Sequence, residues 1–87
     1  MATWRYVVSR SQGGSAEEFQ WEIRELYPGD DGKFGYTENP VSPAGDSFEE
    51  LLSDLEHMRS DADLEILDLT TDPPRLISRS DPEQQSR

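Results

Sequence analysis

The chain has 87 residues, of which 19 are Asp or Glu and 8 are Lys or Arg, giving a formal net charge of −11 at pH 7. Such a charge repels nucleic-acid phosphates and acidic membrane surfaces, and it attracts basic proteins or cations. The absence of cysteine excludes disulfides, thiolate metal sites and cysteine nucleophiles. No apolar run approaches the length of a membrane span and no signal-peptide core follows Met1, so we expect a cytoplasmic protein.

Length and composition predict one small domain followed by a polar end. Hydrophobic residues make up 32% of the chain and aromatic residues 9%, too many aromatics for an acidic disordered chain. The apolar residues are clustered, and the last residues are almost all polar. We therefore expect a folded domain over residues 1–72 and a disordered tail over residues 73–87.

The first half of the chain predicts an antiparallel meander of three strands. Residues 3–9 alternate between two faces, a second alternating run extends from Phe19 to Tyr27, and residues 34–38 return as a third strand. The turn between the last two is a Pro-Gly-Asp-Asp-Gly cluster at residues 28–32, whose glycines permit positive φ. We expect one buried face filled by aromatic side chains: Trp4, Tyr6, Trp21, Tyr27, Phe34 and Tyr36.

An amphipathic helix is predicted next. Asp46 with Glu49, or Ser47 with Glu50, fits the capping box that begins many helices. One apolar stripe follows at helical spacing, and we expect it to cover the aromatic face of the sheet. Its members are Phe48, Leu51, Leu52, Leu55, Met58 and Ala62.

The segment after the helix can be interpreted in two ways. Residues 64–69 could extend the helix or form a short strand; we favour the strand, because residues 61–63 are poor helix formers and Thr70-Thr71 favours strand. Pro73-Pro74 should then end regular structure. The predicted fold is α+β: a three- to four-stranded antiparallel sheet in β-β-β-α-β order, with one amphipathic helix packed on its aromatic face.

Charge is the main functional signal. Residues 45–72 contain ten acids and one base, a local net charge of −9. This surface could be only a solvated helix face, reflecting solubility or salt adaptation, or it could imitate nucleic-acid phosphates. Our hypothesis is a non-enzymatic interaction module without metal or cofactor, which docks a basic protein partner through charge complementarity. The candidate binding residues are Glu49, Glu50, Asp54, Glu56 and Asp61.

Other chemical patterns are weaker. His57 is the only histidine and could serve a small hydrolase as a general acid or base, but its neighbours are those of any acidic helix. Asp30-Asp31-Gly32 resembles a fragment of a calcium loop, yet the alternating oxygen ligands are missing and a hairpin turn explains the residues. An aromatic platform for single-stranded nucleic acid would need a basic groove that this chain lacks.

Two resemblances support the predicted fold. The run from Asp30-Asp31-Gly32-Lys33 to Glu49-Glu50-Leu51 resembles a group of short bacterial proteins that carry no assigned activity. Pro43, Gly45, Ser47 and the Glu49-Glu50 pair also resemble the strand-to-helix junction of HicB-type antitoxins, which share the β-β-β-α-β order. That resemblance implies neutralisation of a basic RNA-cleaving toxin as an alternative function; the polar tail after Pro74 is too short for the DNA-binding segment that those antitoxins usually append.

Overall fold

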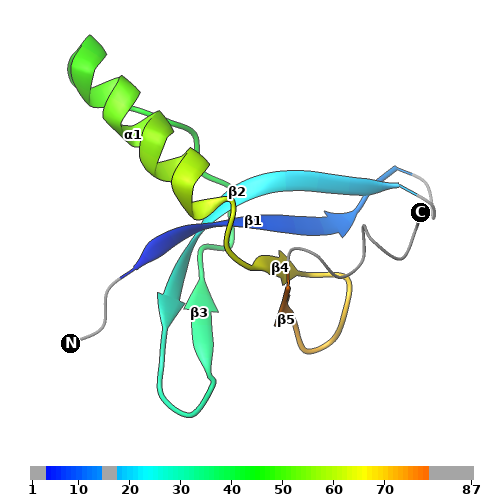
Figure 1. The fold of residues 1–87 in the computed structure, drawn as a ribbon. Coiled ribbons are helices and arrows are strands. Elements are labelled where there is room, and N and C mark those ends of the chain that lie inside the picture. The colour runs from blue at the N-terminus through cyan, green and yellow to red at the C-terminus, as the bar shows by residue number, and fades with distance from the viewer. Residues whose placement is uncertain (1–3, 15–17, 79–87) are drawn as a thin grey trace.

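The computed structural model describes residues 4–14 and 18–78, and in this part of the chain one helix accompanies a five-stranded mixed sheet (Figure 1). The elements are β1 (Arg5–Gln12), β2 (Phe19–Pro28), β3 (Phe34–Tyr36), α1 (Phe48–Asp61), β4 (Ile66–Asp68) and β5 (Arg75–Ile77). The strand order across the sheet is β3-β2-β1-β4-β5. The predicted α+β class is confirmed.

The first three strands form the predicted antiparallel meander. β1 and β2 pair from Arg5 opposite Leu26 to Gln12 opposite Phe19. β3 returns along the C-terminal end of β2 after a turn in which Asp31 and Gly32 have φ of 58° and 78°. Gly adopts positive φ without cost and Asp tolerates it better than most residues, so local turn chemistry specifies this hairpin.

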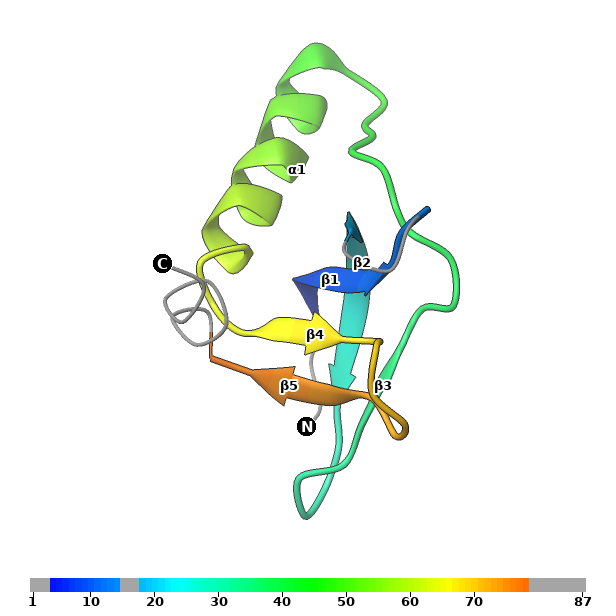
Figure 2. The same ribbon diagram turned by 90° about the vertical axis from the view of Figure 1, so that its right-hand side faces the viewer.

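The prediction of an entirely antiparallel sheet is wrong, because β4 runs parallel to β1. Val8 lies opposite Ile66 and Arg10 opposite Asp68. The cause is the helical connection: α1 ends beside the start of β1, where Asp61 bonds to the Tyr6 amide, so the next strand runs in the same direction as β1 (Figure 2). The favoured interpretation of residues 64–69 is confirmed, since they contain a strand and not an extension of the helix.

A fifth strand corrects the expectation that regular structure ends at Pro73-Pro74. β5 follows directly and pairs antiparallel with β4, with Leu67 opposite Leu76. The two prolines lie in the turn before the strand, where no ladder hydrogen bond is needed from them. β5 lies within the predicted tail of residues 73–87; residues 79–87 of that tail lie outside the described residues, so the expectation of disorder there stays a prediction.

The hydrophobic core lies on one face of the sheet, which we call the core face. Val7, Leu26 and Leu67, from three neighbouring strands, are buried there. The flanking side chains that pack against them are Phe34, Tyr36, Leu69 and Leu76. Since β3 and β5 are the two edges of the sheet, their contributions to one cluster require the sheet to curl around it.

The other face, which we call the aromatic face, carries Tyr6, Val8 and Arg10 of β1 and Phe19, Trp21 and Ile23 of β2, as strand alternation and the register require. Phe34 and Tyr36 do not belong to it. The register places Tyr36 opposite Leu26, so both β3 aromatics contact the core face instead. The predicted set of aromatic residues is therefore split between the two faces of the sheet.

The helix covers much less of the aromatic face than the apolar stripe predicts. α1 packs mainly against β1 with its C-terminal half, and its N-terminal half projects away from the sheet (Figure 1). Met58 is its one buried residue. Phe19 and Trp21 consequently remain 42% and 46% exposed. The expectation of a helix lying across the aromatic face holds only at the end of that face near Tyr6.

Candidate interaction surface

The helix begins at a capped turn that uses one of the predicted acids. Ser47 is the N-cap, and its Oγ accepts a hydrogen bond of 3.1 Å from the Glu50 amide. The Glu50 carboxylate in turn accepts a bond of 2.8 Å from the Asp46 amide. Of the two capping boxes in the sequence, the structure uses Ser47 with Glu50. Glu50 is therefore engaged in beginning the helix, although its side chain is exposed.

Asp54 and Asp61 face the sheet and hold the helix against β1. Asp54 accepts a hydrogen bond from the Tyr6 hydroxyl through one oxygen and a 2.9 Å bond from the Ala44 amide through the other. Asp61 accepts a 3.0 Å bond from the Tyr6 amide. Both carboxylates therefore satisfy donors of this chain, and a partner could use them only by replacing those bonds.

The Tyr6–Asp54 contact changes the acidity of both groups. The hydrogen bond from Tyr6, then the one from the Ala44 amide, lowers the pKa of Asp54 below its usual value. Burial, followed by the hydrogen bond to Asp54, raises the pKa of Tyr6 to about 12. At neutral pH the contact therefore joins a neutral phenol to an ionised carboxylate, the arrangement that gives a charge-assisted hydrogen bond.

Glu49 and Glu56 are the predicted binding residues that remain available. Both side chains are exposed, and neither makes a hydrogen bond or ion pair within residues 4–14 and 18–78. With about 3.6 residues per turn, they lie roughly half a turn around the helix from the buried Met58. The five candidate acids thus divide by structural role, and these two point away from the sheet.

An exposed apolar stripe lies between the sheet-facing side of α1 and these two glutamates. It comprises Phe48, Leu52 and Leu55, which are 69%, 42% and 42% exposed; we call it the helix stripe. The sequence placed these residues in the core. One signal in the sequence argued against this placement. Asp54 and Asp61 lie at helical spacing before and after Met58, so carboxylates share the sheet-facing side of the helix with Met58. The apolar stripe must then turn partly outward.

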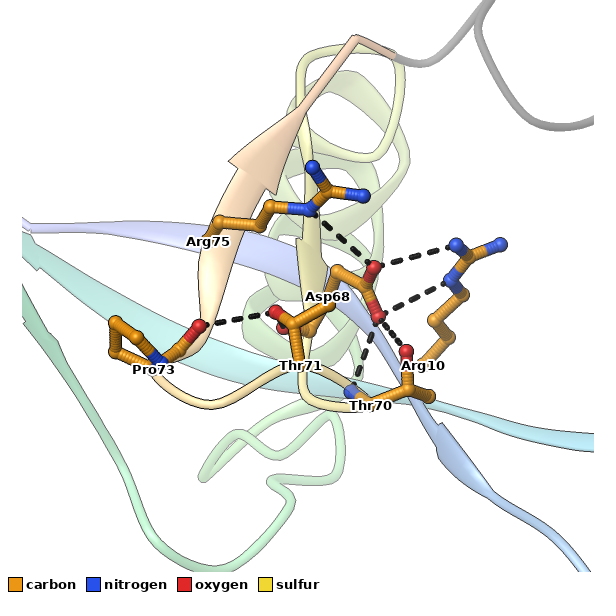
Figure 3. A network of polar contacts seen from close by, with 6 residues as sticks. All are labelled: Arg10, Asp68, Thr70, Thr71, Pro73 and Arg75. Atoms are coloured by element: carbon orange, nitrogen blue, oxygen red, sulfur yellow. Dashed lines mark hydrogen bonds and ion pairs between the residues drawn. The ribbon is translucent and has the colours of Figure 1, made fainter.

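A second polar cluster surrounds the buried side chain of Asp68, at the junction of β1, β4 and β5 (Figure 3). Arg10 donates bonds of 3.3 and 3.2 Å to its two oxygens, and Thr70 donates from its amide at 3.0 Å and its hydroxyl at 2.6 Å. Arg75 adds an ion pair at 3.7 Å. Burial alone would raise the pKa of Asp68, but the bonds from Arg10 and Thr70 outweigh it and lower the pKa to about 2. Its donors are supplied by the chain itself, so this cluster fastens strands together.

The structure gives little support to the other candidate sites named from the sequence. His57 is exposed on the helix. Within residues 4–14 and 18–78, no group of three or more His, Asp or Glu side chains is placed to hold a metal ion. Over the same residues, the one helix is neither long nor apolar enough to cross a membrane.

Comparison with known proteins adds no family assignment. No protein-family model, no curated protein and no solved structure matches the chain. The function is therefore argued from the surfaces of the molecule itself.

Proposed function

We propose that this protein is a non-enzymatic interaction module that docks a basic protein through the outer side of α1. The observation that carries the proposal is the division among the helix acids. Glu50, Asp54 and Asp61 bond to the chain itself, whereas Glu49 and Glu56 stand exposed and unbonded within the described residues. Unpaired acids on a projecting helix attract a basic surface and speed its encounter, since their field is not cancelled by an adjacent base.

The local charge supports the same proposal. Arg59, the only base between residues 45 and 72, forms an ion pair of 2.8 Å with Asp63 in the last turn of the helix. The first turns of α1 therefore keep an uncompensated negative charge, and Figure 1 shows that they are the part of the helix farthest from the sheet. A partner can approach this end without touching the strands.

The test is capture of a basic protein from lysate of the native host at low and high salt. The Glu49→Gln/Glu56→Gln variant should lose most of the low-salt capture, because it removes the two unbonded charges on the outer side of the helix while the bonds of Asp54 and Asp61 remain. The matched control is Asp30→Asn/Glu38→Gln, which removes equal charge from exposed positions around β3. Equal capture by wild type and the helix variant would refute the proposal, and equal losses in both variants would reduce it to an effect of net charge.

Antitoxin activity is a second candidate. The order of β1, β2, β3, α1 and β4 is the β-β-β-α-β order of the HicB-type antitoxins that the junction around Ser47 resembles. In this case the basic partner is an RNA-cleaving toxin encoded beside this chain. Purified protein should then stop RNA cleavage by that toxin at equimolar ratio, and undiminished cleavage would exclude this function while leaving the docking proposal intact.

A further inference from the structure

The exposed apolar side chains on the aromatic side of the sheet include two groups that the helix of the same chain does not cover. One is the helix stripe of Phe48, Leu52 and Leu55. The other lies at the far end of the β1–β2 ribbon, where Phe19 and Trp21 pack edge to face at 6.1 Å between ring centroids; we call it the ribbon patch. Both belong to the aromatic side, since α1 bonds to Tyr6, and Tyr6 shares that face with Trp21.

The helix cannot cover the ribbon patch of its own chain. Asp54 and Asp61 tie α1 to Tyr6, near the start of β1, whereas Phe19 pairs with Gln12 at the end of that strand. Tyr6 and Gln12 are six positions apart along the strand, a distance of roughly 20 Å. From its attachment the helix points away from the ribbon (Figure 1). A second chain is needed to bring a helix onto this patch.

The two surfaces suit each other chemically. A helix with an apolar stripe on the apolar face of a sheet is a common way to bury both. The guanidinium of Arg10 lies 4.5 Å from the centre of the Phe19 ring. Arg10 is paired with Asp68, and Arg75 pairs with the same carboxylate, so two cations and one acid leave one net positive charge in the row that continues from Trp21 across the sheet. Glu22, the acid of β2 nearest the patch, points to the opposite face by strand alternation. The patch therefore offers aromatic surface and positive charge to a stripe bordered by Glu49 and Glu56.

We propose that two copies of this chain form a reciprocal dimer, in which the helix stripe of each copy packs on the ribbon patch of the other. A helix-to-helix dimer would bring the glutamates of one copy toward those of the other, which like-charge repulsion disfavours. A patch-to-patch dimer would bring the net positive charge of Arg10, Asp68 and Arg75 in one copy toward that of the other, and would leave both helix stripes exposed. Only the reciprocal arrangement covers all four surfaces with opposite charges adjacent.

The dimer has a salt dependence opposite to that of the proposed docking. Each copy carries a net charge of −11, so the two repel one another at long range. Added salt screens this repulsion and should strengthen an apolar dimer, whereas it should weaken capture of a basic protein. The two proposals therefore fail separately: a monomer that still captures a basic protein overturns only the dimer.

The test is sedimentation of the full chain over a range of concentrations, at low and high salt. Wild type should sediment at twice the chain mass, more completely at high salt. A stripe variant, Leu52→Ser/Leu55→Ser, and a patch variant, Phe19→Ser/Trp21→Ser, should each be monomeric, with association weakened by at least about tenfold. Leu64→Ser is the matched control, since Leu64 is equally exposed but outside both surfaces, and it should remain dimeric.

Mixing the two variants decides the arrangement. A stripe variant keeps its patch and a patch variant keeps its stripe, so an equal mixture should form a mixed dimer through one restored contact. Dimers built from two helices or two patches cannot be restored in this way. A monomeric wild type, a dimeric variant whose circular dichroism shows the native fold, or a mixture that stays monomeric would each overturn the proposal. If the patch variant fails to fold, Trp21→Ser alone replaces it.

Discussion

The corner around Asp68 and the outer side of α1 both contain carboxylates, yet these carboxylates have different roles. Asp68 is 1% exposed and accepts bonds from Arg10, 58 residues earlier in the chain, and from Thr70 in the turn that follows its own strand. Glu49 and Glu56 are exposed and bond to nothing in the described residues. The comparison teaches that a carboxylate surrounded by donors is part of the scaffold, whereas one left in water is available for recognition. Net charge by itself does not separate the two roles.

The largest effect should come from Asp68→Ala. The substitution leaves the Arg10 guanidinium, 12% exposed, without its carboxylate partner, and removes an acceptor from Thr70. Breaking such a buried pair costs about 3–5 kcal/mol of unfolding free energy. Urea denaturation measures the loss. The control Asp63→Ala breaks an exposed ion pair and should cost less than about 1 kcal/mol; similar losses would mean that Asp68 does not anchor the strands.

Shortening single side chains of α1 to alanine should give the next largest difference in the free energy of unfolding. Met58→Ala removes the one buried side chain of α1 and should cost about 2–4 kcal/mol. Leu55→Ala removes an exposed side chain of the helix stripe and should cost less than about 1 kcal/mol when measured at low protein concentration. A Leu55→Ala cost as large as that of Met58→Ala, measured at the same low concentration, would show that the stripe packs on its own sheet in solution.

Protonation of Asp68 in acid should lower the free energy of unfolding by about 2 kcal/mol. The pKa of Asp68 is lowered from 3.8 to about 2 in the folded chain, so its ionised form stabilises the fold. This stabilisation is complete above pH 3.8 and is lost as the pH falls toward about 2, because there both states bind the proton. Comparing urea denaturation of wild type and Asp68→Asn through this range isolates the effect. Parallel pH profiles for the two proteins would contradict it.

The smallest effect should come from the N-cap. Ser47→Ala removes the oxygen that accepts from the Glu50 amide, which should cost about 1 kcal/mol. Ser53→Ala, at an exposed position in the middle of the helix, should leave stability unchanged or slightly raised. The stability of the first turn of α1 can be followed separately by amide hydrogen exchange. An equal response in both variants would show that the cap does not hold the projecting half.

Much of the local structure could be predicted, and the candidate surface only in part. Alternation identified β1 and β2, turn residues identified the β2–β3 hairpin, and Ser47 with Glu50 marked the helix start. The roles of the helix acids could not be separated, because the donors that engage Asp54 and Asp61 belong to Tyr6, some fifty residues earlier in the chain. The exposure of Leu52 and Leu55 could not be predicted for the same reason, because it follows from how those distant contacts orient the helix.

The sequence by itself determined the α+β class, the three-stranded meander, the helix and the excess of acids, because periodicity, turn residues and charge act within a few residues of one another. Tertiary structure alone decided the parallel β4, the added β5, the burial of Asp68 and the projection of α1. Each depends on which distant groups meet: the tie of Tyr6 to Asp54 and Asp61 fixes the helix at one end of β1, and that attachment leaves both the helix stripe and the ribbon patch exposed.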